Sequence, residues 1–158
     1  MDSTVRAVFL AAVATLGASA GVTQVPKVEP FLGRWVLDKV ASEAAIRQGM
    51  SIPALSTTMK DGRLSVTRGV SSVAQYSLDG TWLDISWNGK PQKSRLSWNG
   101  PSLVLDIRLG SFEGPGETLS LAADKDRLTV DASITLPSGL VATSKMFLDR
   151  DRSGGLNR

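Results

Sequence analysis

Residues 81–109 read TWLDISWNGKPQKSRLSWNGPSLVLDIRL, and this stretch indicates the class of fold. In its last third the apolar residues Leu103, Leu105 and Ile107 alternate with three others. These are Val104, Asp106 and Arg108. Such a period of two is typical of a strand with one apolar face. Two Asn-Gly pairs divide the stretch, and Asn-Gly favours tight hairpin turns because both central residues need a positive φ. The stretch therefore predicts consecutive antiparallel hairpins.

The same signals recur along most of the chain. Asp-Gly pairs at 61–62 and 79–80 mark further tight turns, and residues 128–136 alternate as cleanly as 103–109. The expected strands span 31–38, 54–60, 63–70, 73–78, 81–87, 93–98, 102–110, 117–123, 127–136 and 140–149. Because nearly all of them are joined by tight turns, we predict an all-β fold. It is an antiparallel up-and-down meander that closes into a barrel of about 8–10 strands.

Two segments depart from the alternation. Glu113-Gly114-Pro115-Gly116 predicts a longer loop. Residues 41–48, ASEAAIRQ, are rich in helix formers and are followed by Gly49, so we predict one short helix after the first strand. Such a helix either lies over one mouth of the barrel or is a frayed turn without that role, and the sequence leaves both open.

The first twenty residues are typical of a secretory signal peptide. Arg6 precedes an apolar run over 7–18, and Ala18-Ser19-Ala20 is a cleavage site with small residues. The alternative, a membrane-spanning or buried helix, is disfavoured because a spanning helix needs about 20 apolar residues. We expect cleavage near Ala20 and a periplasmic or secreted protein. The predicted organisation is 1–20 signal peptide, 21–30 linker, 31–150 barrel domain and 151–158 disordered tail.

Composition excludes many classes of function. The chain has no Cys and no His, which removes thiolate and histidine catalysis and the usual zinc and haem ligands. Its net charge is +3, and the densest basic stretch, Lys90, Lys93 and Arg95, is interpreted as a solvated rim rather than a nucleic-acid surface. Trp87 and Trp98 fall on the apolar faces of their strands, so we expect both in the core. We expect no cofactor, no metal, no nucleic acid, no membrane span and a monomer.

Carboxylates are the main remaining candidates for catalysis. A glycosidase needs two carboxyl groups across a cleft. Glu113 and Glu117 flank the Gly-Pro-Gly segment, and we interpret them as an exposed acidic loop. Asp124 and Asp126 lack the dense oxygen ligands of a calcium loop. We therefore predict no catalytic residue and no enzyme.

The start of the first expected strand carries a resemblance to a known family. Residues 31–38 read FLGRWVLD, and a Gly-x-Trp that opens an up-and-down barrel resembles the lipocalin signature. Gly33 and Trp35 match that pattern, and the resemblance implies that Trp35 closes one end of the barrel under Arg150 by a cation–π contact. The layout from 31 to 150 is similar to small secreted lipocalin-like (calycin-type) domains of bacteria, most of them uncharacterised. It lacks the second and third lipocalin motifs and the long C-terminal helix, so a typical lipocalin ligand is not implied.

These observations favour a non-catalytic binding protein that holds a small hydrophobic or amphipathic ligand inside the barrel. The positions expected to face inward and bind it are Leu83, Ile85, Leu103, Leu105, Ile107, Leu128, Val130 and Ile134. The same residues would fill a dry core if the barrel were narrow. The alternative is therefore a structural or interaction module of the cell envelope, with a packed barrel and no small-molecule ligand.

Overall fold

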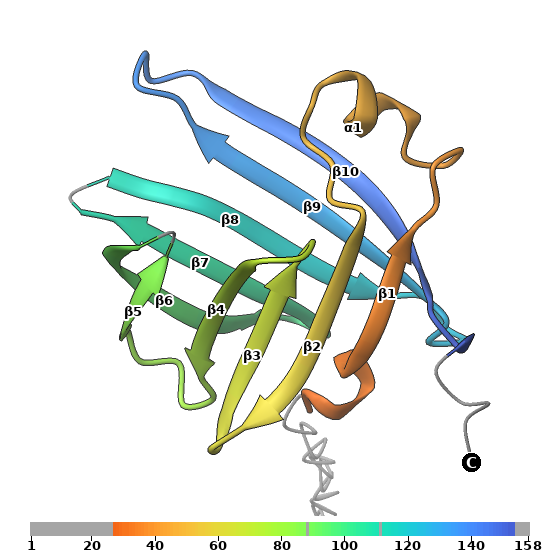
Figure 1. Cartoon of the computed structure of the whole chain (residues 1–158), viewed down its shortest axis with the longest axis horizontal. Helices are drawn as coiled ribbons and strands as arrows, with labels where there is room; N and C mark the ends of the chain where they lie inside the picture. Colours follow the sequence, from red (N-terminus) through yellow and green to blue (C-terminus); the bar gives the residue numbers. More distant parts are fainter. Residues whose placement is uncertain (1–26, 88, 111, 154–158) are drawn as a thin grey trace, which may run out of the picture.

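The computed structural model describes residues 27–87, 89–110 and 112–153, and their strands form one antiparallel sheet. The sheet order is β4-β3-β2-β1-β10-β9-β8-β7-β6-β5, so each hydrogen-bonded pair except β1–β10 is consecutive in sequence. The strands are β1 (Gly33–Leu37), β2 (Ala54–Lys60), β3 (Arg63–Arg68), β4 (Ser72–Ser77), β5 (Leu83–Trp87), β6 (Lys90–Asn99), β7 (Ser102–Leu109), β8 (Phe112–Leu121), β9 (Arg127–Thr135) and β10 (Val141–Arg150). Figure 1 shows this meander curled into a barrel, which confirms the predicted fold class.

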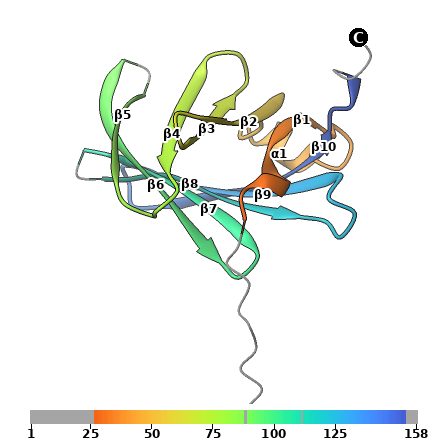
Figure 2. The same cartoon turned by 90° about the horizontal axis from the view of Figure 1, so that it is seen from below.

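The barrel closes between β4 and β5, the two edge strands of the sheet. Figure 2 shows β2–β4 facing β6–β8 as opposing walls. The Ser94 hydroxyl of β6 donates a hydrogen bond to the Gln75 carbonyl of β4, which joins the walls at this seam. The connection from β4 to β5 is ordered by Asp79, whose carboxylate accepts hydrogen bonds from the hydroxyl and amide of Thr81 and from the Ser77 hydroxyl. These donors lower the pKa of Asp79 to about 2.

The predicted loop at 113–116 is wrong, because β8 runs through it. The pairing with β7 shifts register there: Asp106 lies opposite Gly116, but Arg108 lies opposite Glu113. This β-bulge absorbs the extra residue and gives Pro115, which has no N–H to donate, a place in the strand. The glycines and proline at 114–116 do mark an irregular backbone, but the irregularity is a β-bulge within β8 and not a loop between strands.

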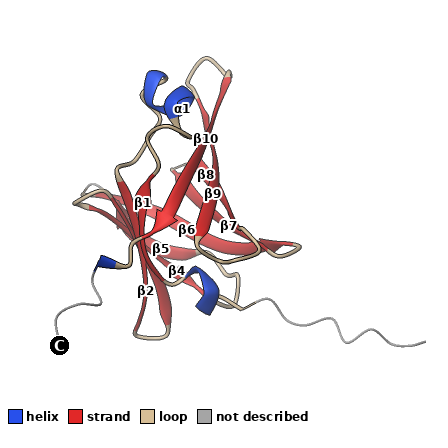
Figure 3. Cartoon of the chain, turned by 90° about the vertical axis from the view of Figure 1, so that its right-hand side faces the viewer, coloured by secondary structure: helices blue, strands red, loops and turns tan. Residues whose placement is uncertain are grey.

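The expected helix is present but shorter than 41–48. It is α1, Glu43–Arg47, and a second short element, the 3-10 helix η1 (Glu29–Phe31), precedes β1. Figure 3 shows α1 beside β10 at one end of the barrel. Its residue Ala45 is buried and belongs to the hydrophobic core. The helix therefore packs on the barrel rather than fraying from it.

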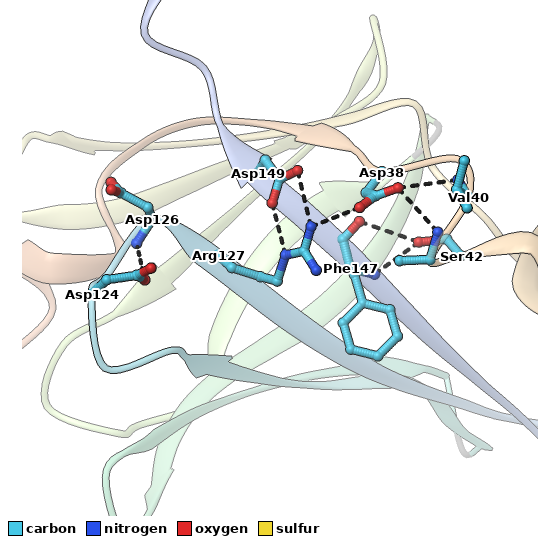
Figure 4. Close-up of polar contacts among 9 residues, drawn as sticks. Asp38, Val40, Ser42, Asp124, Asp126, Arg127, Phe147 and Asp149 are labelled. Atoms are coloured by element: carbon cyan, nitrogen blue, oxygen red, sulfur yellow. Dashed lines mark hydrogen bonds and ion pairs between the residues drawn. The ribbon is translucent and has the colours of Figure 1, made fainter.

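A polar cluster fixes the connection from β1 to α1 against β10 (Figure 4). The Asp38 carboxylate accepts hydrogen bonds from the amides of Ala41 (3.0 Å) and Val40 (3.1 Å), and it pairs with the Arg127 guanidinium at 2.6 Å. The Ala41 amide and Arg127 lower the pKa of Asp38. The Ser42 hydroxyl accepts from the Phe147 amide at 2.9 Å and donates to the Phe147 carbonyl at 3.2 Å. These bonds hold the start of α1 on β10.

Several expectations fall on residues outside the described part of the chain. These are the signal peptide over 1–20, the cleavage site, most of the linker and the end of the tail. In the described part of the expected linker, Val28 packs into the core beside Phe31. None of the helices formed by residues 27–87, 89–110 and 112–153 has both the length and the apolar character needed to cross a membrane.

Candidate ligand-binding site

A hollow of about 440 Å³ lies between α1 and the strands β8, β9 and β10. It is at the end of the barrel where α1 packs beside β10 (Figure 1). The residues that border it are Ala44, Ala45, Gln48, Thr118, Asp131, Ala132, Ser133, Thr143, Ser144 and Lys145. A volume of this size is within the range of small-molecule sites.

Small side chains leave this space open. Ala132 of β9 and Ser144 of β10 are cross-strand partners. They are two residues from the buried Val130 and Met146, so they also face the barrel interior. Neither side chain is large enough to fill the space next to α1. The residues of α1 that border the hollow, Ala44 and Ala45, are also small. The Ser144 hydroxyl donates to the Met50 carbonyl at 3.2 Å, so the segment after the helix is tied down at the same place. This bond holds the segment after α1 against one wall residue of the hollow.

The predicted ligand-binding residues do not border this hollow. Leu103, Leu105, Ile107, Leu128 and Val130 are all buried in the main core, each at most 3% exposed. The remaining three, Leu83, Ile85 and Ile134, are half-buried, and Ile85 packs against that core. The middle of the barrel is therefore packed, and the hollow of 440 Å³ lies at the end beside α1. Trp87 and Trp98 are half-buried against the same core.

A buried polar cluster crosses the barrel interior. The Arg68 Nε of β3 donates to both carboxylate oxygens of Glu117 on β8, at 2.8 and 2.9 Å. The Arg68 and Glu117 side chains are 7% and 10% exposed. Arg68 also donates to the Tyr76 hydroxyl at 3.0 Å, and its guanidinium lies 5.2 Å from the centre of the Trp87 ring. The cluster thus links β3, β4, β5 and β8 across the seam.

Burial and charge set the protonation of this cluster. Burial is the main cause that raises the pKa of Tyr76, to about 12, although the Arg68 charge opposes it. Burial opposes the charge on Arg68, but Glu117 and Tyr76 together raise its pKa, so the guanidinium stays protonated. Its Nη1 atom is buried and has no hydrogen-bond partner among the described residues. The N–H groups of this nitrogen are therefore not used by any described residue.

The interpretation of Glu117 as part of an exposed acidic loop is wrong. Glu117, Leu119 and Leu121 are two residues apart in β8, so their side chains lie on the same, inward face of the strand. The same parity places Arg68 in line with Leu64 and Val66. Alternation could have identified both residues, because a charged side chain at an inward position implies a buried partner. Glu117 faces an arginine rather than a second carboxylate, and the side chain of Glu113 lies outside the described part of the structure.

Sheet register places the polar cluster next to the hollow. Glu117 lies opposite Ala132, and Ala132 lies opposite Ser144. Neighbouring strands are about 4.8 Å apart, so Glu117 is one strand from one wall residue of the hollow and two strands from the other. The buried pair is therefore close to the hollow, although neither Arg68 nor Glu117 borders it.

The opposite end of the barrel is closed by Trp35, Arg150 and Gly33. Trp35 is fully buried, its indole N–H donates to the Phe31 carbonyl at 3.0 Å, and the Arg150 guanidinium lies 4.1 Å from the ring centre. Arg150 also donates to the carbonyls of Leu32 and Pro30, both at 2.9 Å. Gly33 has φ +128°, and a Cβ there would lie 3.1 Å from the Arg150 Nη1. Glycine is thus required by both conformation and space.

No cluster of three or more acidic side chains placed to hold a metal ion occurs within residues 27–87, 89–110 and 112–153. His and Cys are absent from the whole sequence. The residues that border the hollow beside α1 offer apolar surface and hydrogen-bonding groups to a small molecule.

Comparison of the sequence with known proteins finds no matching family model and no matching curated protein. Comparison of the structure finds similar barrels. A zebrafish ileal bile acid-binding protein complexed with cholic acid is 14% identical, with a TM-score of 0.53 over 77% of this chain and 99% of that one. A secretory abundant heat soluble protein of Ramazzottius varieornatus is 11% identical, with a TM-score of 0.55 over 77% and 96%. A fatty acid transporter is 10% identical, with a TM-score of 0.52 over 78% and 99%. These likenesses show the fold alone, an antiparallel up-and-down β-barrel.

Proposed function

We propose that this calycin-type barrel is a non-catalytic binding protein that holds a small hydrophobic or amphipathic molecule in the hollow between α1 and β8–β10. The observation that carries the proposal is the 440 Å³ hollow, which lies at one end of an otherwise packed barrel. Two proteins of similar fold are a bile acid-binding protein and a fatty acid transporter, which supports the same ligand class.

The walls of the hollow favour an amphipathic ligand. Ala44, Ala45 and Ala132 offer apolar surface, whereas the other wall residues carry hydroxyl, amide or charged groups. Apolar contact supplies most of the binding free energy in such sites, and a few polar groups fix the orientation. A ligand with one polar end therefore matches the walls better than a pure hydrocarbon.

The packed centre of the barrel supports a second candidate, a structural or interaction module without a small ligand. Leu103, Leu105 and Leu128 belong to one continuous core and are at most 1% exposed. In that case the hollow beside α1 would hold only water. Ligand binding separates the two candidates.

Filling the hollow tests the proposal directly. Ala44 is an exposed residue of α1 that borders the hollow, whereas Ala41 is exposed, precedes the helix and does not border it. Ala44→Trp should weaken binding of the fluorescent probe anilinonaphthalenesulfonate, and its displacement by dodecanoate, by at least about tenfold, which corresponds to about 1.4 kcal/mol. Ala41→Trp is the matched control and should bind as the unmodified chain does. Absence of saturable binding, or equal losses in both variants, would contradict the proposal.

We also propose that the protein is exported to the periplasm or the medium. Support comes from Arg6, the apolar run over 7–18 and the small residues that end at Ala20. N-terminal sequencing of the protein recovered from its source should begin at Gly21. An intact Met1 in the recovered protein would refute the export proposal.

A further inference from the structure

A second hollow lies on the outer face of the barrel wall, over β6–β9. Its volume is about 190 Å³. The residues that border it are Trp82, Arg95, Asp106, Ile107, Arg108, Gly116, Ser133 and Thr135. Arg95 lies beside the inward-facing Ser94 and Leu96, and Asp106 lies between the buried Leu105 and Ile107, so both side chains point outward.

One row of cross-strand partners forms the floor of this hollow. Arg95 lies opposite Asp106, Asp106 opposite Gly116, and Gly116 opposite Ser133. A Cβ at Gly116 would lie 3.3 Å from the Asp106 Oδ1 and 3.5 Å from the Ser133 Oγ. The absence of a side chain at Gly116 therefore makes the depression between an arginine–aspartate pair and a serine hydroxyl.

Trp82 positions two guanidinium groups at the hollow. The Cζ atoms of Arg95 and Arg108 lie 4.6 and 4.4 Å from the centre of its ring. Guanidinium stacking on an aromatic ring restricts the side chain and leaves its N–H edges free to donate. The Arg95 Nη2 pairs with Asp106 at 3.2 Å, whereas the buried Arg95 Nε has no partner among the described residues.

The groups that surround the hollow are mostly hydrogen-bond donors. Two guanidinium groups and the hydroxyls of Ser133 and Thr135 outnumber the single carboxylate of Asp106. Arginine forks match the geometry of carboxylate, phosphate and sulfate groups. We propose that this outer hollow is a binding site for a small oxyanion, which the Arg95 and Arg108 guanidinium groups hold above Gly116.

This site differs from the proposed ligand hollow beside α1, although Ser133 borders both hollows. Neither arginine nor Trp82 borders the α1 hollow. Weaker phosphate binding in the Arg95 and Arg108 variants therefore reports on the outer hollow, whereas Ala44→Trp reports on the hollow beside α1.

Titration with inorganic phosphate at constant ionic strength tests the oxyanion site. The Nε–H resonance of Arg95, followed by nuclear magnetic resonance, should shift saturably. Arg95→Gln, followed through its backbone amide, and Arg108→Gln should each weaken phosphate binding by at least about tenfold, as loss of a charge-assisted bond predicts. Arg63→Gln is the matched control, because Arg63 is an exposed strand residue that borders neither hollow. Its affinity for phosphate should stay that of the unmodified chain.

Gly116→Ala tests the shape of the site without changing its charge. Gly116 lacks a positive φ, so its backbone conformation suits alanine, and the methyl group would occupy the floor of the hollow and displace the Asp106 carboxylate by a few tenths of an ångström. Phosphate binding should weaken at least about fivefold while the melting temperature is nearly unchanged. A linear, non-saturable shift in the unmodified chain would overturn the proposal. So would unchanged binding in the Arg95 and Arg108 variants, or equal weakening in Arg63→Gln.

Discussion

Tyr76 is the sole tyrosine of the chain, so its ionisation can be followed without interference from another tyrosine. Burial raises its pKa to about 12, above the ordinary value near 10. Folding therefore favours the protonated phenol. The stabilisation from this group is fully present below pH about 10 and is lost as the pH rises towards 12. Phenolate absorbance should titrate near 12 in the folded chain and near 10 in urea; a folded midpoint near 10 would contradict the buried position.

Glu117 and Arg68 form a buried pair, and removing one partner leaves an uncompensated charge. Glu117→Ala should lower the free energy of unfolding by about 3–5 kcal/mol. The double variant Arg68→Met/Glu117→Leu should recover most of that loss, because it removes both charges and keeps apolar volume. Urea denaturation of the three chains measures both effects.

An exposed pair provides the control for this comparison. Lys93 and Asp84 make a contact of 2.8 Å on the surface, where their side chains are 50% and 85% exposed. Asp84→Ala should cost less than about 1 kcal/mol. Similar costs for Glu117→Ala and Asp84→Ala would show that the interior pair is solvated, contrary to the structure.

Trp35 fills one end of the barrel under Arg150. Its truncation to alanine removes a fully buried ring and leaves the Phe31 carbonyl without its indole donor. Trp35→Ala should lower the free energy of unfolding by about 3–5 kcal/mol, as large-to-small changes in cores do. A cost below about 1 kcal/mol in urea denaturation would contradict its role in closing that end.

At the scale of elements, α1 is too short to be stable alone and depends on its contacts with β10. Ser42→Ala removes the acceptor of the Phe147 amide, which should cost about 1–3 kcal/mol and speed amide hydrogen exchange in α1. Ser86 is an exposed serine of β5, and Ser86→Ala is the matched control. Unchanged exchange in Ser42→Ala would mean that other contacts hold the helix.

The elements also show which features could be predicted from the sequence. β7 and β9 alternate without interruption, and their predicted and observed bounds agree within one residue. β8 was predicted to begin five residues late, because Gly-Pro-Gly signals a turn and the register shift that absorbs it depends on β7. Glu117 was misassigned for the same reason. The hollow beside α1 was missed because it arises between distant segments, and no local pattern reports a gap left by small side chains.

At the scale of the whole molecule, the barrel is one sheet whose two edges meet without a continuous ladder. The buried Arg68–Glu117 pair, the Arg68–Trp87 contact and the Ser94–Gln75 bond join the two sides of that seam. Polar contacts across a seam are directional, so they fix how the two walls face each other. The centre of the barrel is packed, and the end beside α1 holds the larger of the two hollows described here.

Native mass spectrometry of the protein isolated gently from its source tests the central claim most directly. If the hollow beside α1 binds a small hydrophobic or amphipathic molecule, the folded protein should carry extra mass that is lost on denaturation, and the released compound should belong to that class. A folded mass equal to that of the polypeptide alone, unchanged after incubation with dodecanoate, would contradict the claim.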